Sequence, residues 1–354
     1  MDIAFITNTF PDLETASIGT QRMLKVFREV PCVDHIHFIT GNYPNSGLRV
    51  DNCTMTLIDK PTGNKWVSYA KVEKLIAEVL SGVIDRISTV VINSPAPHLV
   101  LAYAKARGKK ILYMPSGSVK LNCGWVSRQL ETLNFELSDK IVIYSDRLIP
   151  DYGLEKYRSK IVLAYNHFID TEKFKTVTPH YERLDVVGFI GRLDKEKGIL
   201  SYLNTVPKIV PFLDSMSVSG TGLFENMVKA TARAYKEFDY LGWVSHKDVP
   251  SLLNQWKLLV IPSINEGLPN TLLEAMICGT PVLASPVGAI PDLVKHGMTG
   301  FIWDNKEPLH KGIIEALNYP KISTVINNAK DVAEGFTLDS LVVKYNNILE
   351  GLIE

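Results

Sequence analysis

The clearest pattern in the chain is a pair of short apolar runs joined by an amphipathic segment. Leu258–Ile261 is a run of four aliphatic residues that ends at Pro262, and a second apolar run covers residues 281–284. Between them, residues 271–278 carry apolar side chains at helical spacing and stop at Gly279. Short apolar runs bounded by proline or glycine are typical of buried strands. The pattern therefore predicts strand, helix and strand, with the two strands parallel.

The same alternation of apolar runs and amphipathic segments covers the rest of the chain. Further strands are predicted at residues 3–6, 35–39, 55–58, 89–92, 110–113, 140–145, 161–164, 186–190, 215–219 and 240–244. Long helices are predicted at residues 21–30, 67–80, 99–105 and 337–352. Strands that alternate with helices predict an α/β fold with Rossmann-like parallel sheets. A chain of 354 residues has room for two such domains.

Two carboxylates flank the start of the predicted helix at 271–278. Glu266 precedes it and Glu274 lies about one turn inside it. The backbone N–H groups of Asn270, Thr271 and Leu272 should be open there and favour a phosphate. Carboxylates on either side would accept hydrogen bonds from hydroxyls, so the segment suits a nucleotide-sugar. A surface helix with acidic residues near its N-terminus would explain only part of the segment.

A second polar segment follows the predicted strand at 186–190. It reads Gly191-Arg192-Leu193-Asp194-Lys195-Glu196-Lys197-Gly198. A guanidinium offers a planar fork of donors and an ammonium a compact charge, so the two suit different phosphate oxygens. Alone, this segment would be interpreted as a solvated loop. Together with the two carboxylates, it indicates a diphosphate site.

Residues 266–291 resemble the signature of the retaining glycosyltransferases of family 4, whose E-x7-E motif is matched by Glu266 and Glu274. The segment from Gly191 to Gly198 resembles the Gly-Arg…Lys-Gly loop of that family. The resemblance implies the GT-B fold, in which two Rossmann-like domains face each other across a cleft and the C-terminal helix crosses back to the N-terminal domain. Residues 1–165, completed by helix 337–354, would bind the acceptor. Residues 166–336 would bind the nucleotide-sugar donor.

The resemblance also implies roles for individual residues. Arg192, Lys197 and Glu266 would be catalytic, the first two at the diphosphate and Glu266 at the transferred sugar. Glu274 would hold the ribose. The other donor-binding residues would be Gly19, Gly191, Gly220, Gly242, Trp243, Asn270, Thr271 and Leu272. Trp243 either stacks on the base or is partly buried packing at a strand end.

The acceptor side departs from the family pattern. Many members carry a catalytic histidine where this chain has Pro115 and Ser116. His98 and Ser116 are the acceptor-side candidates, because both follow predicted strands. His98 could equally be a surface residue at the start of a helix. We expect a loop from Thr7 to Ser17, after which Ile18-Gly19-Thr20 leads into the helix at 21–30. Gly19 matches the second glycine of the family's N-terminal glycine pair.

Charge and cysteine content indicate which classes of binding partner and which cellular compartment to expect. The formal net charge is +0, which does not favour nucleic acid. Residues 1–165 carry 20 basic and 16 acidic side chains, a mild excess that suits an acidic acceptor or peripheral contact with a membrane. The four cysteines have no ligand-like spacing, the start lacks the basic residues of a signal peptide, and no apolar run is long enough to cross a bilayer. We expect a cytoplasmic protein, with a peripheral position at the cytoplasmic membrane face as the alternative.

The predicted function is a retaining glycosyltransferase of the hexosyltransferase type. It would move a sugar from a UDP-, GDP- or ADP-sugar to a hydroxyl of a glycan, a glycolipid, another lipid-linked acceptor or a small molecule. We expect no metal and no cofactor, since the donor-site loops hold no paired acidic motif. A nucleotide-sugar epimerase of the same fold and a nucleotide-sugar-binding protein with impaired catalysis are the alternatives.

Overall fold

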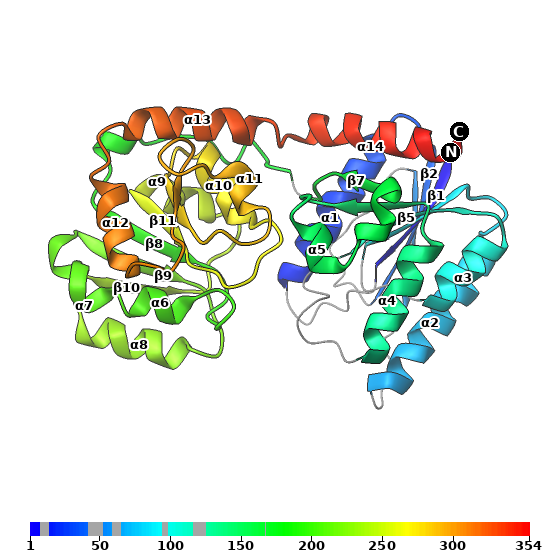
Figure 1. The fold of residues 1–354 in the computed structure, drawn as a ribbon, viewed down its shortest axis with the longest axis horizontal. Helices are drawn as coiled ribbons and strands as arrows, with labels where there is room; N and C mark the ends of the chain where they lie inside the picture. Colours follow the sequence, from blue (N-terminus) through cyan, green and yellow to red (C-terminus); the bar gives the residue numbers. More distant parts are fainter. Residues whose placement is uncertain (8–13, 42–51, 59–64, 94–97, 116–124, 167) are drawn as a thin grey trace. The chain divides into compact units, whose positions relative to one another are not determined.

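The computed structural model describes the whole chain except residues 8–13, 42–51, 59–64, 94–97, 116–124 and 167. These residues form two units (Figure 1). The first comprises residues 1–168 and 338–354, and the second comprises residues 169–337. Each unit is built on one parallel sheet, so the predicted α/β class with two Rossmann-like domains is confirmed.

The first unit contains a seven-stranded sheet in the order β3-β2-β1-β4-β5-β6-β7. Its strands are β1 (Asp2–Thr7), β2 (His35–Gly41), β3 (Cys53–Ile58), β4 (Thr89–Asn93), β5 (Lys110–Met114), β6 (Lys140–Ile143) and β7 (Ile161–Leu163). All neighbouring strands pair in parallel. The central strand β4 is buried along its whole length, because its β-branched residues lie between two layers of helices.

Helices cover both faces of this sheet. The helices of the first unit are α1 (Glu14–Glu29), α2 (Lys65–Ser81), α3 (His98–Ala106), α4 (Trp125–Leu137), α5 (Leu148–Tyr152) and α14 (Leu338–Ile353). One apolar core joins α2, α3, α4 and α5 to one face of the sheet (Figure 1). A second core joins α1 and α14 to the other face. Within the described residues, no helix is long and apolar enough to span a membrane.

The C-terminal helix α14 is part of the first unit, although residues 169–337 precede it in the chain. Tyr345 anchors it: the ring is fully buried, packs edge-on against Phe27 at 5.4 Å, and its hydroxyl donates to the Tyr165 carbonyl at 3.0 Å. The return of the chain to the first unit is therefore confirmed, and it follows from the apolar face of the helix.

The start of α1 differs from the prediction. We expected a loop up to Ser17 and a helix from Gln21, but the helix begins at Glu14, so Gly19 lies inside α1. A glycine in a helix costs only about 1 kcal/mol relative to alanine, and the helix formers around it can offset this. The glycine was wrongly interpreted as part of a loop.

The second unit contains a six-stranded parallel sheet in the order β10-β9-β8-β11-β12-β13. Its strands are β8 (Val186–Ile190), β9 (Ser215–Ser219), β10 (Phe238–Gly242), β11 (Leu258–Ile261), β12 (Val282–Ala284) and β13 (Phe301–Ile302). Its helices are α6 (Ile199–Leu203), α7 (Val206–Ile209), α8 (Glu225–Ala234), α9 (Val249–Gln255), α10 (Asn270–Ile277), α11 (Ile290–Leu293), α12 (Leu309–Leu317) and α13 (Ile322–Glu334). One apolar core joins α6, α7, α8 and α12 to the sheet.

The strand–helix–strand segment at the centre of this unit is as predicted. β11 and β12 pair in parallel and α10 connects them. The helix ends before Gly279, whose φ of 70° is a left-handed conformation that glycine adopts readily. Strand β10 instead ends two residues earlier than predicted, because Gly242 also has a left-handed φ, of 68°. Trp243 therefore lies in the following loop.

Candidate functional site

The carboxyl ends of four neighbouring strands form one edge of the second sheet. The strands are β10, β9, β8 and β11, in that order, and a loop follows each of them. The loops are joined by backbone hydrogen bonds. Leu193 donates to the Thr221 carbonyl at 2.9 Å, and Ile264 donates to the Glu196 carbonyl at 2.7 Å. The residues predicted after β8 and β11 are therefore held side by side.

Two glycines allow this close approach. A side chain at Gly198 would place its Cβ 1.9 Å from the carbonyl oxygen of Pro262, and one at Gly220 would lie 1.8 Å from that of Gly191. Both glycines also have positive φ, 73° and 135°. Any other residue would push the loops after β8, β9 and β11 apart.

Lys197 and Glu266 form the central ion pair of the site. The Lys197 Nζ lies 2.6 Å from Glu266 Oε1, and the two side chains are 26% and 8% exposed. The Ser263 hydroxyl donates to the same carboxylate oxygen at 2.8 Å. The Lys197 backbone N–H donates to Asp194 Oδ1 at 2.9 Å. An ammonium has three donors, so Lys197 can hold Glu266 and still bond to a phosphate.

Arg192 lies at the surface of the same loop and contacts two carboxylates. Its Nη1 is 2.8 Å from Asp194 Oδ2, and its Nη2 is 3.2 Å from Glu196 Oε2. The guanidinium side chain is 59% exposed. A phosphate that approaches Arg192 must therefore compete with these two carboxylates.

Glu274 is the most buried acidic residue of the site. It is 3% exposed and accepts a hydrogen bond from His246 Nε2 at 2.9 Å. The sequence pattern indicated no role for His246. The only signal was its position in a loop after a predicted strand, because a separation of 28 residues from Glu274 gives no indication of contact.

The predicted row of three open amides is wrong at Leu272. The Leu272 N–H donates to the Pro269 carbonyl at 3.2 Å, because Pro269 precedes the first turn of α10 and its carbonyl points into that turn. Leu272 therefore does not offer its amide to a ligand. Asn270 and Thr271 lie in the first turn, at the end where a helix favours negative charge.

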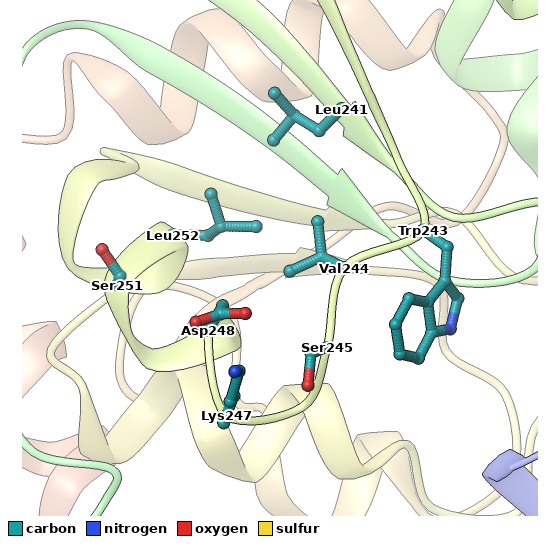
Figure 2. A pocket seen from close by; sticks show the side chains of 8 residues that line it. All are labelled: Leu241, Trp243, Val244, Ser245, Lys247, Asp248, Ser251 and Leu252. Atoms are coloured by element: carbon teal, nitrogen blue, oxygen red, sulfur yellow. The ribbon is translucent and has the colours of Figure 1, made fainter.

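A surface hollow of about 760 Å³ lies beside this site. Figure 2 shows its lining residues: Leu241, Trp243, Val244, Ser245, Lys247, Asp248, Ser251 and Leu252. They come from the end of β10, the loop after it and α9. Trp243 is 53% exposed, so most of its ring is accessible at the surface. Its predicted role at the base stays a prediction.

The remaining predicted site residues lie in the first unit or outside the residues that the structure describes. Gly19 is in α1, and His98 is the first residue of α3. Ser116 lies outside the described residues. The His98 backbone N–H donates to Glu73 Oε1 at 2.8 Å, and its Nδ1 donates to Asn134 Oδ1 at 2.7 Å. The roles of these residues at an acceptor stay predictions.

His98 belongs to a buried polar network between the helices and the sheet of the first unit. Glu131 accepts hydrogen bonds from the Tyr113 hydroxyl at 2.5 Å and from Asn134 Nδ2 at 2.9 Å. Burial raises the pKa of the Glu131 carboxyl, while the bonds from Tyr113 and Asn134 oppose that increase. The network joins α4 to β5 and to the start of α3.

Arg183 fixes the far end of α10, a function that the sequence pattern did not suggest. Its guanidinium donates to four backbone carbonyls and to one hydroxyl, those of Thr178, Leu253, Trp256, Cys278 and Thr280. Burial lowers the pKa of Arg183 to about 10. This clamp orients the helix that carries Glu274. Among the described residues, no group of three or more His, Cys, Asp or Glu side chains could hold a metal ion.

Comparison with known proteins finds a family match over most of the second unit. Residues 185–319 match the family described as "Glycosyl transferases group 1". An uncharacterized glycosyltransferase of Methanocaldococcus jannaschii is 30% identical over 176 residues, which are 47% of this chain and 45% of that protein. The 2-deoxystreptamine N-acetyl-D-glucosaminyltransferase of Niallia circulans is 26% identical over 192 residues, 50% and 49% of the two chains. The matches thus span about half the length of these relatives.

Solved structures match over nearly the whole chain. Sucrose-phosphate synthase of Thermosynechococcus elongatus superposes with a TM-score of 0.81 at 16% identity and covers 99% of both chains. HepE of Anabaena, in complex with UDP and glucose, gives 0.77 at 18% identity and covers 99% of this chain and 100% of its own. At such low identity the likeness establishes the fold, which is GT-B as the resemblance implied.

Proposed function

We propose that this chain, whose residues 185–319 match the family described as "Glycosyl transferases group 1", is a retaining glycosyltransferase that uses a nucleoside-diphosphate sugar. The observation that carries the proposal is the convergence of Lys197, Glu266 and Glu274 at one sheet edge. Lys197 contacts Glu266 at 2.6 Å, and Glu274 lies about one turn inside the helix that follows Glu266. One basic group and two hydroxyl acceptors at this edge suit a donor with sugar, diphosphate and ribose in series.

The proposed reaction exchanges one bond at the anomeric carbon. The bond to the β-phosphate oxygen breaks, and a bond to the acceptor oxygen forms on the same face. The acceptor hydroxyl gives its proton to the departing nucleoside diphosphate, so nothing is oxidised or reduced. Negative charge grows on the leaving phosphate, where the fixed charges of Lys197 and Arg192 stabilise it. Glu266 orients the transferred sugar through its hydroxyls.

A reducing compartment fits this proposal. Cys32, Cys53 and Cys278 are free thiols, and burial raises the pKa of Cys53 to about 11 and that of Cys278 to about 12. Unreactive thiols of this kind are typical of cytoplasmic proteins. We therefore propose that the reaction takes place in the cytoplasm. The proposed acceptor is a glycan or a lipid-linked molecule, which the first unit would reach by peripheral contact with the membrane.

The test begins with the donor. UDP, GDP and ADP should differ in how much they raise the thermal midpoint, because stabilisation follows ligand concentration over Kd. The matching labelled nucleotide-sugars are then incubated with acceptor extracts. Transfer supports the proposal, whereas a free epimer would favour the epimerase alternative and binding without turnover would favour a donor-binding protein.

Glu274→Ala tests the proposed ribose-binding role of Glu274 most directly. A hydrogen bond to a charged group contributes about 1.5–3 kcal/mol, so the affinity for the preferred nucleoside diphosphate should fall by that amount. Calorimetry measures it, and Glu315→Ala in the exposed His296–Glu315 pair is the matched control. Unchanged affinity in Glu274→Ala would remove this residue from the donor site.

A further inference from the structure

His246 connects two parts of the second unit that are far apart in sequence. It lies in the loop after β10, and its ring bonds to Glu274 inside α10 at 2.9 Å. Its neighbours Ser245 and Lys247 line the surface hollow shown in Figure 2, but the lining does not include His246. The loop therefore turns two side chains toward the hollow and the side chain between them toward the buried carboxylate.

The orientation of the His246 ring is set from two directions. On one side its Nε2 donates to Glu274 Oε1, and the two side chains are 37% and 4% exposed. On the other side the ring packs on Phe174, a fully buried residue, with centroids 5.2 Å apart and planes tilted by 50°. A ring held in this way offers a fixed donor rather than one that rotates in solvent.

We infer that His246 is a positioning residue that holds the Glu274 carboxylate in the orientation in which it accepts ribose hydroxyls. The inference rests on the proposed role of Glu274 at the ribose. A glutamate side chain has several rotatable bonds, and a buried one needs a donor to fix them. A carboxylate has about four lone-pair sites, so one carboxylate can accept from a histidine and from hydroxyls at the same time. The bond also couples the loop beside the hollow to the ribose position.

The test measures how well the full chain distinguishes a ribose from a sugar without hydroxyls. The probes are whichever of UDP, GDP and ADP binds best and its 2′,3′-dideoxy counterpart, and calorimetry gives both affinities. In His246→Phe, which keeps an aromatic ring on Phe174 but removes the donor, we expect about tenfold weaker binding of the ribonucleotide. The dideoxy nucleotide should change less than about twofold, because it makes no bond to Glu274.

Three further variants make the result decisive. His246→Gln retains an N–H donor and should recover most of the ribose discrimination, which a merely structural role for the ring would not predict. Adding His246→Phe to Glu274→Ala should change the discrimination no further. If His246→Phe lowers the thermal midpoint, His246→Ala, which adds no bulk, replaces it in the same measurement.

The outcomes separate this inference from the proposed function. Wild-type protein that binds none of the three nucleotides would overturn the proposed function and this inference together. Wild-type protein that prefers the ribonucleotide, with the same preference in His246→Phe, would overturn the inference alone. An equal loss for both nucleotides would also overturn it, because His246 would then support the site without orienting Glu274.

Discussion

Each unit of the protein buries a glutamate near a histidine, but the two clusters have different surroundings. In the first unit, Glu131 accepts from Tyr113 and Asn134, and Asn134 accepts from His98. His98 in turn donates its backbone N–H to the buried Glu73. The hydrogen bonds of this first-unit network run between helices and sheet. They join α4 to β5 and to the start of α3.

In the second unit the corresponding cluster opens at the sheet edge. Glu274 and Glu266 are almost fully buried, but their partners His246 and Lys197 are 37% and 26% exposed. These partners stand on the loops after β10 and β8, where parallel sheets bind ligands. A buried glutamate beside a histidine is therefore no sign of function by itself. The position of the second-unit partners, on loops at the edge of the sheet, is what supports a binding role for that cluster.

The largest effect should come from Lys197, the charged group of the open cluster. Lys197→Ala should lower kcat by about 10²–10³-fold, as loss of a donor at a developing negative charge does. KM for the donor should change much less, because the charge on the leaving phosphate is greater in the transition state. Steady-state kinetics with the donor found in the nucleotide screen gives both constants.

Lys195→Ala is the matched control for this experiment. Lys195 lies in the same loop and is exposed, so its removal subtracts the same charge without touching Glu266. Its kcat should stay near that of the wild type. A raised KM with normal kcat in Lys197→Ala would instead show that Lys197 binds ground state and transition state equally.

The buried Glu131 of the first unit should act on stability and leave donor binding unchanged. Glu131→Leu leaves the Tyr113 hydroxyl and the Asn134 amide without their acceptor, and each such loss costs about 1–3 kcal/mol. We expect a total loss of about 2–4 kcal/mol in the free energy of unfolding of this unit. Chemical denaturation measures it, and calorimetry on the same protein measures nucleoside diphosphate affinity.

Glu131→Gln is an intermediate variant for the same stability measurement. Its amide keeps one carbonyl oxygen for Tyr113 but turns a donor toward Asn134, so the loss should be intermediate. A variant that kept its stability but lost donor affinity would contradict the distinction between the two clusters.

Much of the second unit could be predicted from local sequence. The run Leu258–Ile261, the helix after Pro269 and the stop at Gly279 each carry their own signal, and the structure confirms all three. Lys197 and Glu266 were assigned separately, through a resemblance to a family. Their contact at 2.6 Å depends on two loops that approach through Gly198, and local sequence does not report such an approach.

The misses have three causes. Nothing near His246 or Arg183 in sequence indicates their partners, which lie 28 and up to 97 residues away. The Leu272 amide was expected to be open, but its bond to Pro269 depends on the path of the chain before the helix. At Gly19, a weak local signal for a loop was outweighed by a helix that continues through it. The sequence alone therefore leaves out contacts between distant segments and the exact ends of some elements.

The smallest effect should come from the carboxylates that compete for Arg192. Glu196 lies 3.2 Å from Arg192 Nη2, and both side chains are more than half exposed. Solvent screens such pairs, so each contributes little. Glu196→Gln removes one competitor for the guanidinium and one negative charge near the phosphates. The affinity for the preferred nucleoside diphosphate should therefore rise by about two- to threefold, and the gain should shrink as salt is added.

Asp194 is the wrong residue for this test, because its other oxygen accepts the Lys197 backbone N–H at 2.9 Å and so shapes the loop. Glu307→Gln is the matched control: it removes the same charge from an exposed pair with Lys311, a residue of α12. Calorimetry at low and high salt separates the two variants. An affinity that falls in Glu196→Gln would mean that Glu196 holds Arg192 in place for the phosphate, and the open cluster would then extend to this carboxylate.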